Sequence, residues 1–133
     1  MLKRSVEREQ AFILLFEKSF NAEVELAELY DMAVENEVIE DGEFTKALLL
    51  TAWKKVEEID AVIEKNSKGW KIGRISKVSL AVLRLAICEI LYMEDIPAGV
   101  SINEAVELCK KYAANDEPSF VNGILGTVAK EVK

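Results

Sequence analysis

The side chains of this sequence that could do chemistry are mainly lysines and arginines, because the chain contains no histidine. Imidazole metal ligands, imidazole general bases and Ser-His or Cys-His catalysis are therefore all excluded. The cations gather in two places: Lys3, Arg4 and Arg8 form one cluster, and residues 65–84 contain six basic residues and no acidic one. Such clusters can follow the phosphates of a nucleic acid. The sequence therefore contains two locally basic segments.

The negative charge is concentrated elsewhere in the chain. The net charge is −7, and residues 17–43 hold ten acidic residues against the single Lys18. A chain polarised in this way can present a locally positive surface despite its negative total. A further group of carboxylates in residues 57–64 has no other ligand type nearby, so we expect a solvated helix face there and neither a metal ion nor another cofactor.

The elements that position these side chains are predicted to be helices. Two prolines, six glycines and long apolar repeats with a period near 3.6 predict an all-α protein. The most apolar segment, residues 78–93, predicts a central helix enclosed by the others. Arg84 and Glu89 interrupt it and exclude a membrane span, which needs roughly 20 apolar residues. Ser76 can cap this helix, and Pro97 ends it.

Three helices are expected before the central one. They cover residues 3–18, a segment capped by Asn21, and residues 44–65. A polar break then follows, and it predicts one domain made of two subdomains, at about residues 1–66 and 67–133.

Two helices are expected after the central one. Ser101 and Glu104 have the spacing of a capping box at the start of the first. The second begins near Pro118, which is acceptable in a first turn. Gly123 costs this helix about 1 kcal/mol relative to alanine, so close packing or a closely approaching partner is expected there.

The two cysteines and the N-terminal residues indicate the cellular compartment in which the protein is expected. Cys88 and Cys109 lie in apolar helical contexts without CxxC spacing, as small buried hydrophobic residues of a reducing cytoplasm do. The charged first ten residues do not have the pattern of a signal peptide. We therefore expect a cytoplasmic protein without a membrane partner.

Four segments in the second half carry a family resemblance. They are WKIGRISKV (residues 70–78), LRLAICEIL (83–91), PAGVSINEAVELCKKY (97–112) and FVNGIL (120–125). In this order they resemble the NusB family of transcription antitermination factors, and the similarity extends over residues 4–125. The resemblance implies an all-α fold of about seven helices in two small subdomains. It also implies a role that is not enzymatic.

The resemblance further implies partners and site residues. NusB proteins pair with NusE, a small-subunit ribosomal protein, and bind boxA RNA within an RNA polymerase antitermination complex that reads through ribosomal RNA operons. Arg4 and Arg8, with Lys3 nearby, match the family's arginine-rich RNA-binding segment. Phe16 and Asp116 match positions at the NusE interface.

Arg84 and Phe120 are further candidate binding residues. For each of them a purely structural role is at least as well supported by the sequence. Arg84, in so apolar a helix, either pairs with a carboxylate of a neighbouring helix or contacts RNA. Phe120 is a candidate partner-binding residue, although the helical spacing of Phe16 and Phe120 is also typical of core positions.

Departures from the family pattern motivate an alternative function. Only two arginines remain in the basic segment, an Asp-Arg pair is replaced by Ser79 and Leu80, and a lysine is replaced by Gly99. The alternative is a NusB-fold protein-interaction module with little RNA binding of its own. The NusB-like domain of RNA methyltransferases is a weaker alternative, because the sequence has no glycine-rich cofactor loop. A homodimer is also possible, since a second copy, NusE or the chain's own core could cover the first helix.

Overall fold

The computed structural model describes residues 2–132, and the helices that it contains confirm the predicted fold class. No strand occurs in this range. The elements in chain order are α1 (Arg4–Lys18), α2 (Leu26–Glu35), α3 (Glu43–Lys54), α4 (Val56–Asn66), the 3-10 helix η1 (Ile72–Arg74), α5 (Lys77–Tyr92), α6 (Ala98–Tyr112) and α7 (Glu117–Glu131).

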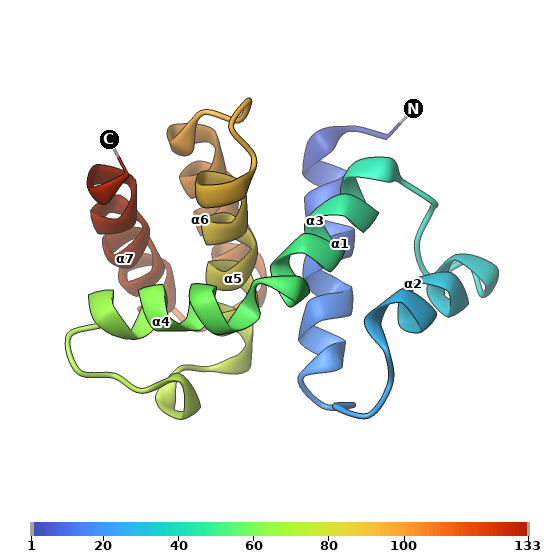
Figure 1. The fold of residues 1–133 in the computed structure, drawn as a ribbon, viewed down its shortest axis with the longest axis horizontal. Helices are drawn as coiled ribbons and strands as arrows, with labels where there is room; N and C mark the ends of the chain where they lie inside the picture. Colours follow the sequence, from blue (N-terminus) through green and yellow to red (C-terminus); the bar gives the residue numbers. More distant parts are fainter. Residues whose placement is uncertain (1, 133) are drawn as a thin grey trace.

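The helices form two neighbouring groups around α5. Figure 1 shows α1, α2 and α3 on one side, and α5, α6 and α7 on the other. Helix α4 runs across the second group, past α5 and α7. The central helix packs against α1, α3, α4, α6 and α7. The division into subdomains near residue 66 stays a prediction, but α4 packs against α5 and α7, so the chain passes between the two groups at Lys55.

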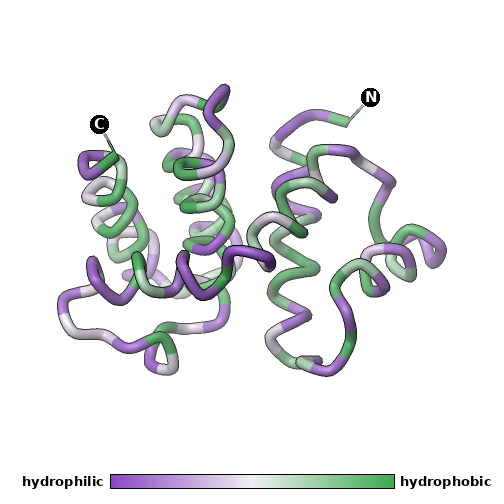
Figure 2. The backbone as a smooth tube through the Cα atoms, in the orientation of Figure 1, coloured by the Kyte–Doolittle hydropathy of each residue, from purple (hydrophilic) through white to green (hydrophobic). Residues whose placement is uncertain are grey.

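The predicted central helix is confirmed, together with its cap. Helix α5 begins at Lys77, and the Ser76 hydroxyl accepts a hydrogen bond from the backbone N–H of Ser79 at 3.1 Å. Its apolar side chains lie in the interior, and Leu83 and Ile87 are both 0% exposed. Burying each such side chain contributes roughly 1.5–3 kcal/mol. Figure 2 shows the hydrophobic run in the middle of α1, which packs against this core.

The prediction of one helix over residues 44–65 was wrong, because the structure has two. Helix α3 ends at Lys54, and Lys55, with φ −103° and ψ 15°, lies outside the helical region before α4 begins. The bend lets α3 pack against α1 and α5 while α4 packs against α5 and α7, and Leu48 of α3 and Ile63 of α4 are both fully buried. No glycine or proline marks this turn in the sequence. Packing against two different sets of helices explains it.

Two predicted caps were also wrong. Helix α2 begins at Leu26, and Asn21 instead donates its side-chain N–H to the carbonyl of Glu17 at 3.4 Å. Helix α6 begins directly after Pro97, so Ser101 lies inside the helix and its hydroxyl serves another partner.

The last helix begins as predicted, but its glycine is not closely packed. Pro118 lies in the first turn of α7. A Cβ added at Gly123 would meet no described atom within 4 Å. Close packing within the chain therefore does not explain this glycine.

Candidate functional site

The N-terminal basic cluster is divided by the fold, because only its first two members face solvent. Lys3 and Arg4 are exposed, and neither takes part in an ion pair with the described residues. The Arg4 guanidinium lies 4.0 Å from the centre of the Phe44 ring. This contact orients the guanidinium across the start of α3 and leaves its charge unneutralised.

Arg8 points into the protein instead. It is only 5% exposed, and its Nε and Nη2 donate to the two carboxylate oxygens of Glu89 at 2.8 and 2.9 Å. The Ser101 hydroxyl also donates to Glu89, at 2.8 Å, and Glu104 lies 3.6 Å from Arg8 Nη1. Arg8 therefore joins α1 to α5 and α6 through a buried bidentate ion pair. The spacing of Arg4 and Arg8 did not reveal this, because Glu89 is 81 residues away.

Arg84 forms the ion pair that was one of its two predicted roles. Its Nε and Nη2 donate to the carboxylate oxygens of Asp60, on α4, at 2.9 and 2.8 Å. Only 13% of the Arg84 side chain is exposed. The guanidinium also lies 5.9 Å from the centre of the Trp53 ring. Its charge is thus neutralised within the fold.

The carboxylates of α4 are engaged in structural contacts. Asp60 holds Arg84, Glu64 accepts the backbone N–H of Ile72 at 2.9 Å, and Glu58 accepts the Tyr92 hydroxyl at 2.8 Å. No group of three or more potential metal ligands occurs among residues 2–132. In the same range, no helix has the length and apolarity needed to cross a membrane.

The fold places the predicted partner-binding residues around the starts of α5 and α7. Phe16 is half-buried, between Phe12 at 5.9 Å and Phe20 at 5.1 Å. Phe20 is 60% exposed, and the Lys77 ammonium lies 5.2 Å from its ring centre. Lys77 follows Ser76 in the chain, and the Ser76 hydroxyl donates to Glu117. Phe16 is thereby linked through successive contacts to the start of α7.

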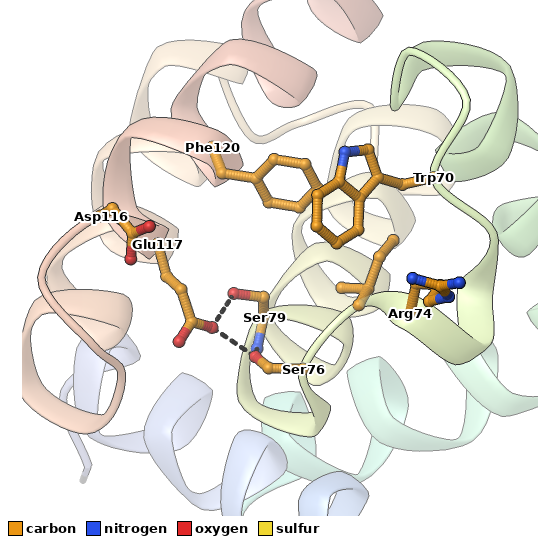
Figure 3. Close-up of a pocket in the computed structure, with 8 residues that line it drawn as sticks. Trp70, Arg74, Ser76, Ser79, Asp116, Glu117 and Phe120 are labelled. Atoms are coloured by element: carbon orange, nitrogen blue, oxygen red, sulfur yellow. Dashed lines mark hydrogen bonds between the residues drawn. The ribbon is translucent and has the colours of Figure 1, made fainter.

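Asp116 and Phe120 line a surface cavity of about 290 Å³ at this end of the molecule. Asp116 is exposed and precedes α7, and Phe120 lies one turn further on. Figure 3 shows the Phe120 ring beside Trp70, and Asp116, at the start of the same helix as Phe120, further from Trp70. The two ring centres are 6.0 Å apart, and Trp70 is 51% exposed. The cavity therefore combines exposed aromatic surface with a carboxylate.

Glu117 forms the floor of this cavity and is held in its ionised form. Its carboxylate accepts hydrogen bonds from the hydroxyls of Ser76 and Ser79, the latter at 2.6 Å, and from the backbone N–H of Ala114 at 3.2 Å. Burial favours the neutral acid, but together these hydrogen bonds outweigh it and lower the pKa of Glu117. Sequence reasoning missed Glu117 and Trp70. The pair Ser76 and Ser79, three residues apart at a helix start, was the available signal.

We refer to Phe16, Phe20, Asp116 and Phe120 as the docking surface. Its apolar rings and carboxylate match a protein partner that offers apolar side chains and a cation.

Comparison with known proteins gives consistent matches over the whole chain. A model of the NusB family matches residues 5–130. The transcription antitermination protein NusB of Ruminiclostridium cellulolyticum is 44% identical over 129 residues, which are 96% of this chain and 88% of that protein. The structure of T. maritima NusB aligns with a TM-score of 0.87 and 31% identity, covering 98% of this chain and 92% of that one. A structure of antitermination factors NusB and NusE in complex with dsRNA aligns with a TM-score of 0.85 and 32% identity, covering 96% of both chains.

Proposed function

Because this chain belongs to the NusB family of transcription antitermination factors, we propose that it binds RNA together with NusE. In this proposal, the pair recognises boxA RNA and joins an RNA polymerase antitermination complex that reads through terminators in ribosomal RNA operons. The observation that carries the proposal is the placement of Asp116 and Phe120 at one cavity, with Phe16 linked to it through Phe20. A structural neighbour of this chain is a NusB in complex with NusE and dsRNA.

NusE is the proposed occupant of the docking surface. Phe120 and the exposed part of Phe20 offer apolar area, and Asp116 offers a carboxylate to a cation of the partner. Aromatic residues at the centre of an interface commonly carry most of its binding energy, at about 2 kcal/mol or more each. Phe120→Ala should therefore weaken NusE binding at least roughly 30-fold, as measured by calorimetry. Met32→Ala, at an exposed apolar residue of α2, is the matched control and should leave NusE binding unchanged.

RNA is proposed to contact the exposed cations Lys3 and Arg4. Two cations give weak binding alone, so NusE must supply additional contacts. Each phosphate contact to single-stranded RNA changes the salt slope, the change in log K per unit log salt concentration, by about 0.7. Loss of both contacts in Lys3→Gln/Arg4→Gln should therefore reduce the slope by about 1.4.

The test is a fluorescence anisotropy titration with boxA RNA, with and without NusE, at several salt concentrations. The proposal predicts weak binding by the chain alone, tighter binding with NusE, and weaker binding of a scrambled RNA. Equal affinity for boxA and scrambled RNA in the presence of NusE would refute boxA recognition.

The alternative is a protein-interaction module with little RNA binding of its own. The internal ion pairs of Arg8 and Arg84 favour this candidate, because they neutralise two of the four cations that the sequence offered for RNA contact. It predicts that this chain binds NusE with full affinity, and that the affinity of NusE for RNA is the same with and without this chain.

A further inference from the structure

A second group of exposed cations lies in the segment that joins α4 to α5 and at the first residue of α5. We call residues 68–77 the basic loop, and its four cations are Lys68, Lys71, Arg74 and Lys77. All four are exposed, and none takes part in an ion pair with another described residue. The contrast with Arg8 and Arg84, whose charges are neutralised internally, leaves the basic loop as a concentrated source of positive charge.

The basic loop is held in a defined conformation. The buried Ser67 hydroxyl donates to the backbone carbonyl of Trp70 at 2.5 Å. The backbone N–H of Trp70 donates in return to the carbonyl of Ser67 at 3.3 Å. Glu64 fixes the start of η1 by accepting the N–H of Ile72. Ile75 is 7% exposed and anchors the loop in the core. The cations therefore project from a preorganised backbone, so a ligand that binds them has little loop ordering to offset.

Trp70 presents a large aromatic surface beside these cations. It is 51% exposed, and Phe120 contacts it at an interplanar angle of 59°. Phe120 and Trp70 do not stack face to face, so ring surface of Trp70 remains open to solvent. An aromatic ring next to a row of cations is the combination that binds single-stranded nucleic acid, because bases stack on the ring while the cations follow the phosphates.

From this combination we propose that the basic loop is a second contact for single-stranded RNA, in which a base stacks on Trp70 and Lys68 and Lys71 hold flanking phosphates. The proposal rests on the proposed RNA-binding function and extends it to a loop whose Lys77 lies at the opposite end of α1 from Lys3 and Arg4. Lys77 marks that end, because its ammonium donates to the carbonyl of Ser19 at 3.5 Å.

The separation of the two cationic sites defines the RNA that can reach both. Helix α1 has 15 residues and is therefore about 22 Å long. Lys77 is therefore separated from Arg4 by roughly the length of α1, and Lys68 and Lys71 precede Lys77 in the basic loop. The ten acidic residues of the segment 17–43 are all exposed and repel phosphate from the α2 side of the molecule. At the roughly 3.4 Å per nucleotide of a stacked DNA strand, a strand of about twelve nucleotides extends about 40 Å, which is longer than α1.

The first test removes two loop charges. Lys68→Gln/Lys71→Gln should reduce the salt slope of RNA binding by about 1.4, because each lost phosphate contact contributes about 0.7. Lys46→Gln/Lys54→Gln, at two exposed lysines of α3, removes the same charge and should leave the slope unchanged. Both variants are measured with NusE present, after circular dichroism has shown native helicity. An unchanged slope in the loop variant, or an equal reduction in the control, would overturn the proposal.

The second test observes Trp70 directly. In Trp53→Phe the emission comes from Trp70 alone, since the chain has two tryptophans. Adding a single-stranded RNA of about twelve nucleotides, without NusE and at low salt, should quench this emission and protect it from acrylamide. Binding of RNA without any change in Trp70 emission contradicts the proposal. So does quenching by NusE but not by RNA, which would assign the loop to a protein partner.

The two proposals fail in different ways. If boxA and scrambled RNA bind equally well and both quench Trp70, boxA recognition is refuted while the basic loop remains an RNA contact. If boxA binding is specific but Trp70 and the salt slope do not respond, only the loop proposal is refuted. Absence of any RNA binding by the wild type, with and without NusE, refutes both.

Discussion

The buried pair of Arg8 and Glu89 allows a sharp test of whether Arg8 serves the fold or the RNA. Arg8→Ala leaves the Glu89 carboxylate, in a residue that is 2% exposed, with the Ser101 hydroxyl as its remaining hydrogen-bond donor among the described residues. Removing one partner of a buried ion pair typically costs 3–5 kcal/mol. The free energy of unfolding of a small domain is about 5–15 kcal/mol. Arg8→Ala should therefore remove a large part of the stability.

The assay is urea unfolding followed by circular dichroism, with thermal unfolding as a second measurement. For a chain of this size, 1 kcal/mol changes the melting temperature by roughly 3–5 °C, so Arg8→Ala should lower it by about 10–20 °C. Arg8→Met/Glu89→Leu removes both charges together and should recover most of the loss, since apolar replacements of a buried pair are often neutral or stabilising. The matched control is Arg4→Ala, because Arg4 is exposed and contacts Phe44 only through its ring, worth about 0.5–1 kcal/mol.

RNA binding by the double variant separates the two roles of Arg8. If Arg8 acts only through Glu89, the salt slope of Arg8→Met/Glu89→Leu should equal that of the wild type, whereas loss of a phosphate contact lowers it by about 0.7. A loss of less than about 1 kcal/mol in Arg8→Ala, below the range for a broken buried pair, would refute the structural assignment.

Three further predictions concern individual side chains. Glu7 accepts the N–H groups of Phe44 and Thr45 at 3.1 Å and so caps α3 from a distance; Glu7→Ala should lower the free energy of unfolding by about 1–2 kcal/mol in urea titrations. Glu117 has a folded pKa below its ordinary value of 4.5, so its stabilising contribution is present above pH 4.5 and is lost as the pH falls through the folded pKa; Glu117→Gln should unfold with a weaker pH dependence in that range, as calorimetry at several pH values would detect. Burial, with a smaller effect of the Glu89 charge, raises the pKa of Cys88 to about 12, and burial also raises that of Cys109, so neither thiol should react with a thiol reagent at pH 8 until the protein is unfolded.

The elements that sequence reasoning predicted correctly are those with local signals. The central helix has a long apolar run and a serine cap, and the last helix has a proline in its first turn, so both were found close to their observed starts. The turn at Lys55 has no such signal, because it is set by which helices α3 and α4 pack against. The cap that Glu7 provides to α3 was equally hidden, since its partners are 37 and 38 residues away.

The charged residues of the candidate site also depend on contacts between distant parts of the chain, which the sequence does not reveal. The sequence identifies a cation but not its carboxylate, so Arg4 and Arg8 look equivalent when only their spacing is known. In the structure one lies on an exposed ring and the other is buried against Glu89. The resemblance identified Asp116, and Phe120 was a separate candidate, but the sequence did not indicate the cavity they share with Trp70, because that cavity forms only when the loop before α5 meets the start of α7.

These ion pairs also determine how RNA affinity can arise. With the charges of Arg8 and Arg84 neutralised by Glu89 and Asp60, the exposed positive charge of the two basic segments lies mainly in the start of α1 and in the basic loop. If both proposed sites bind RNA, neither alone offers more than a few phosphate contacts, and each should bind weakly and in a salt-sensitive way. A single RNA that reaches both sites gains affinity because the second contact becomes intramolecular. A partner held at the docking surface, next to Trp70, can add a third contact to the same RNA. Affinity should therefore rise steeply with RNA length and with NusE, and should fall only moderately when any one cation is removed.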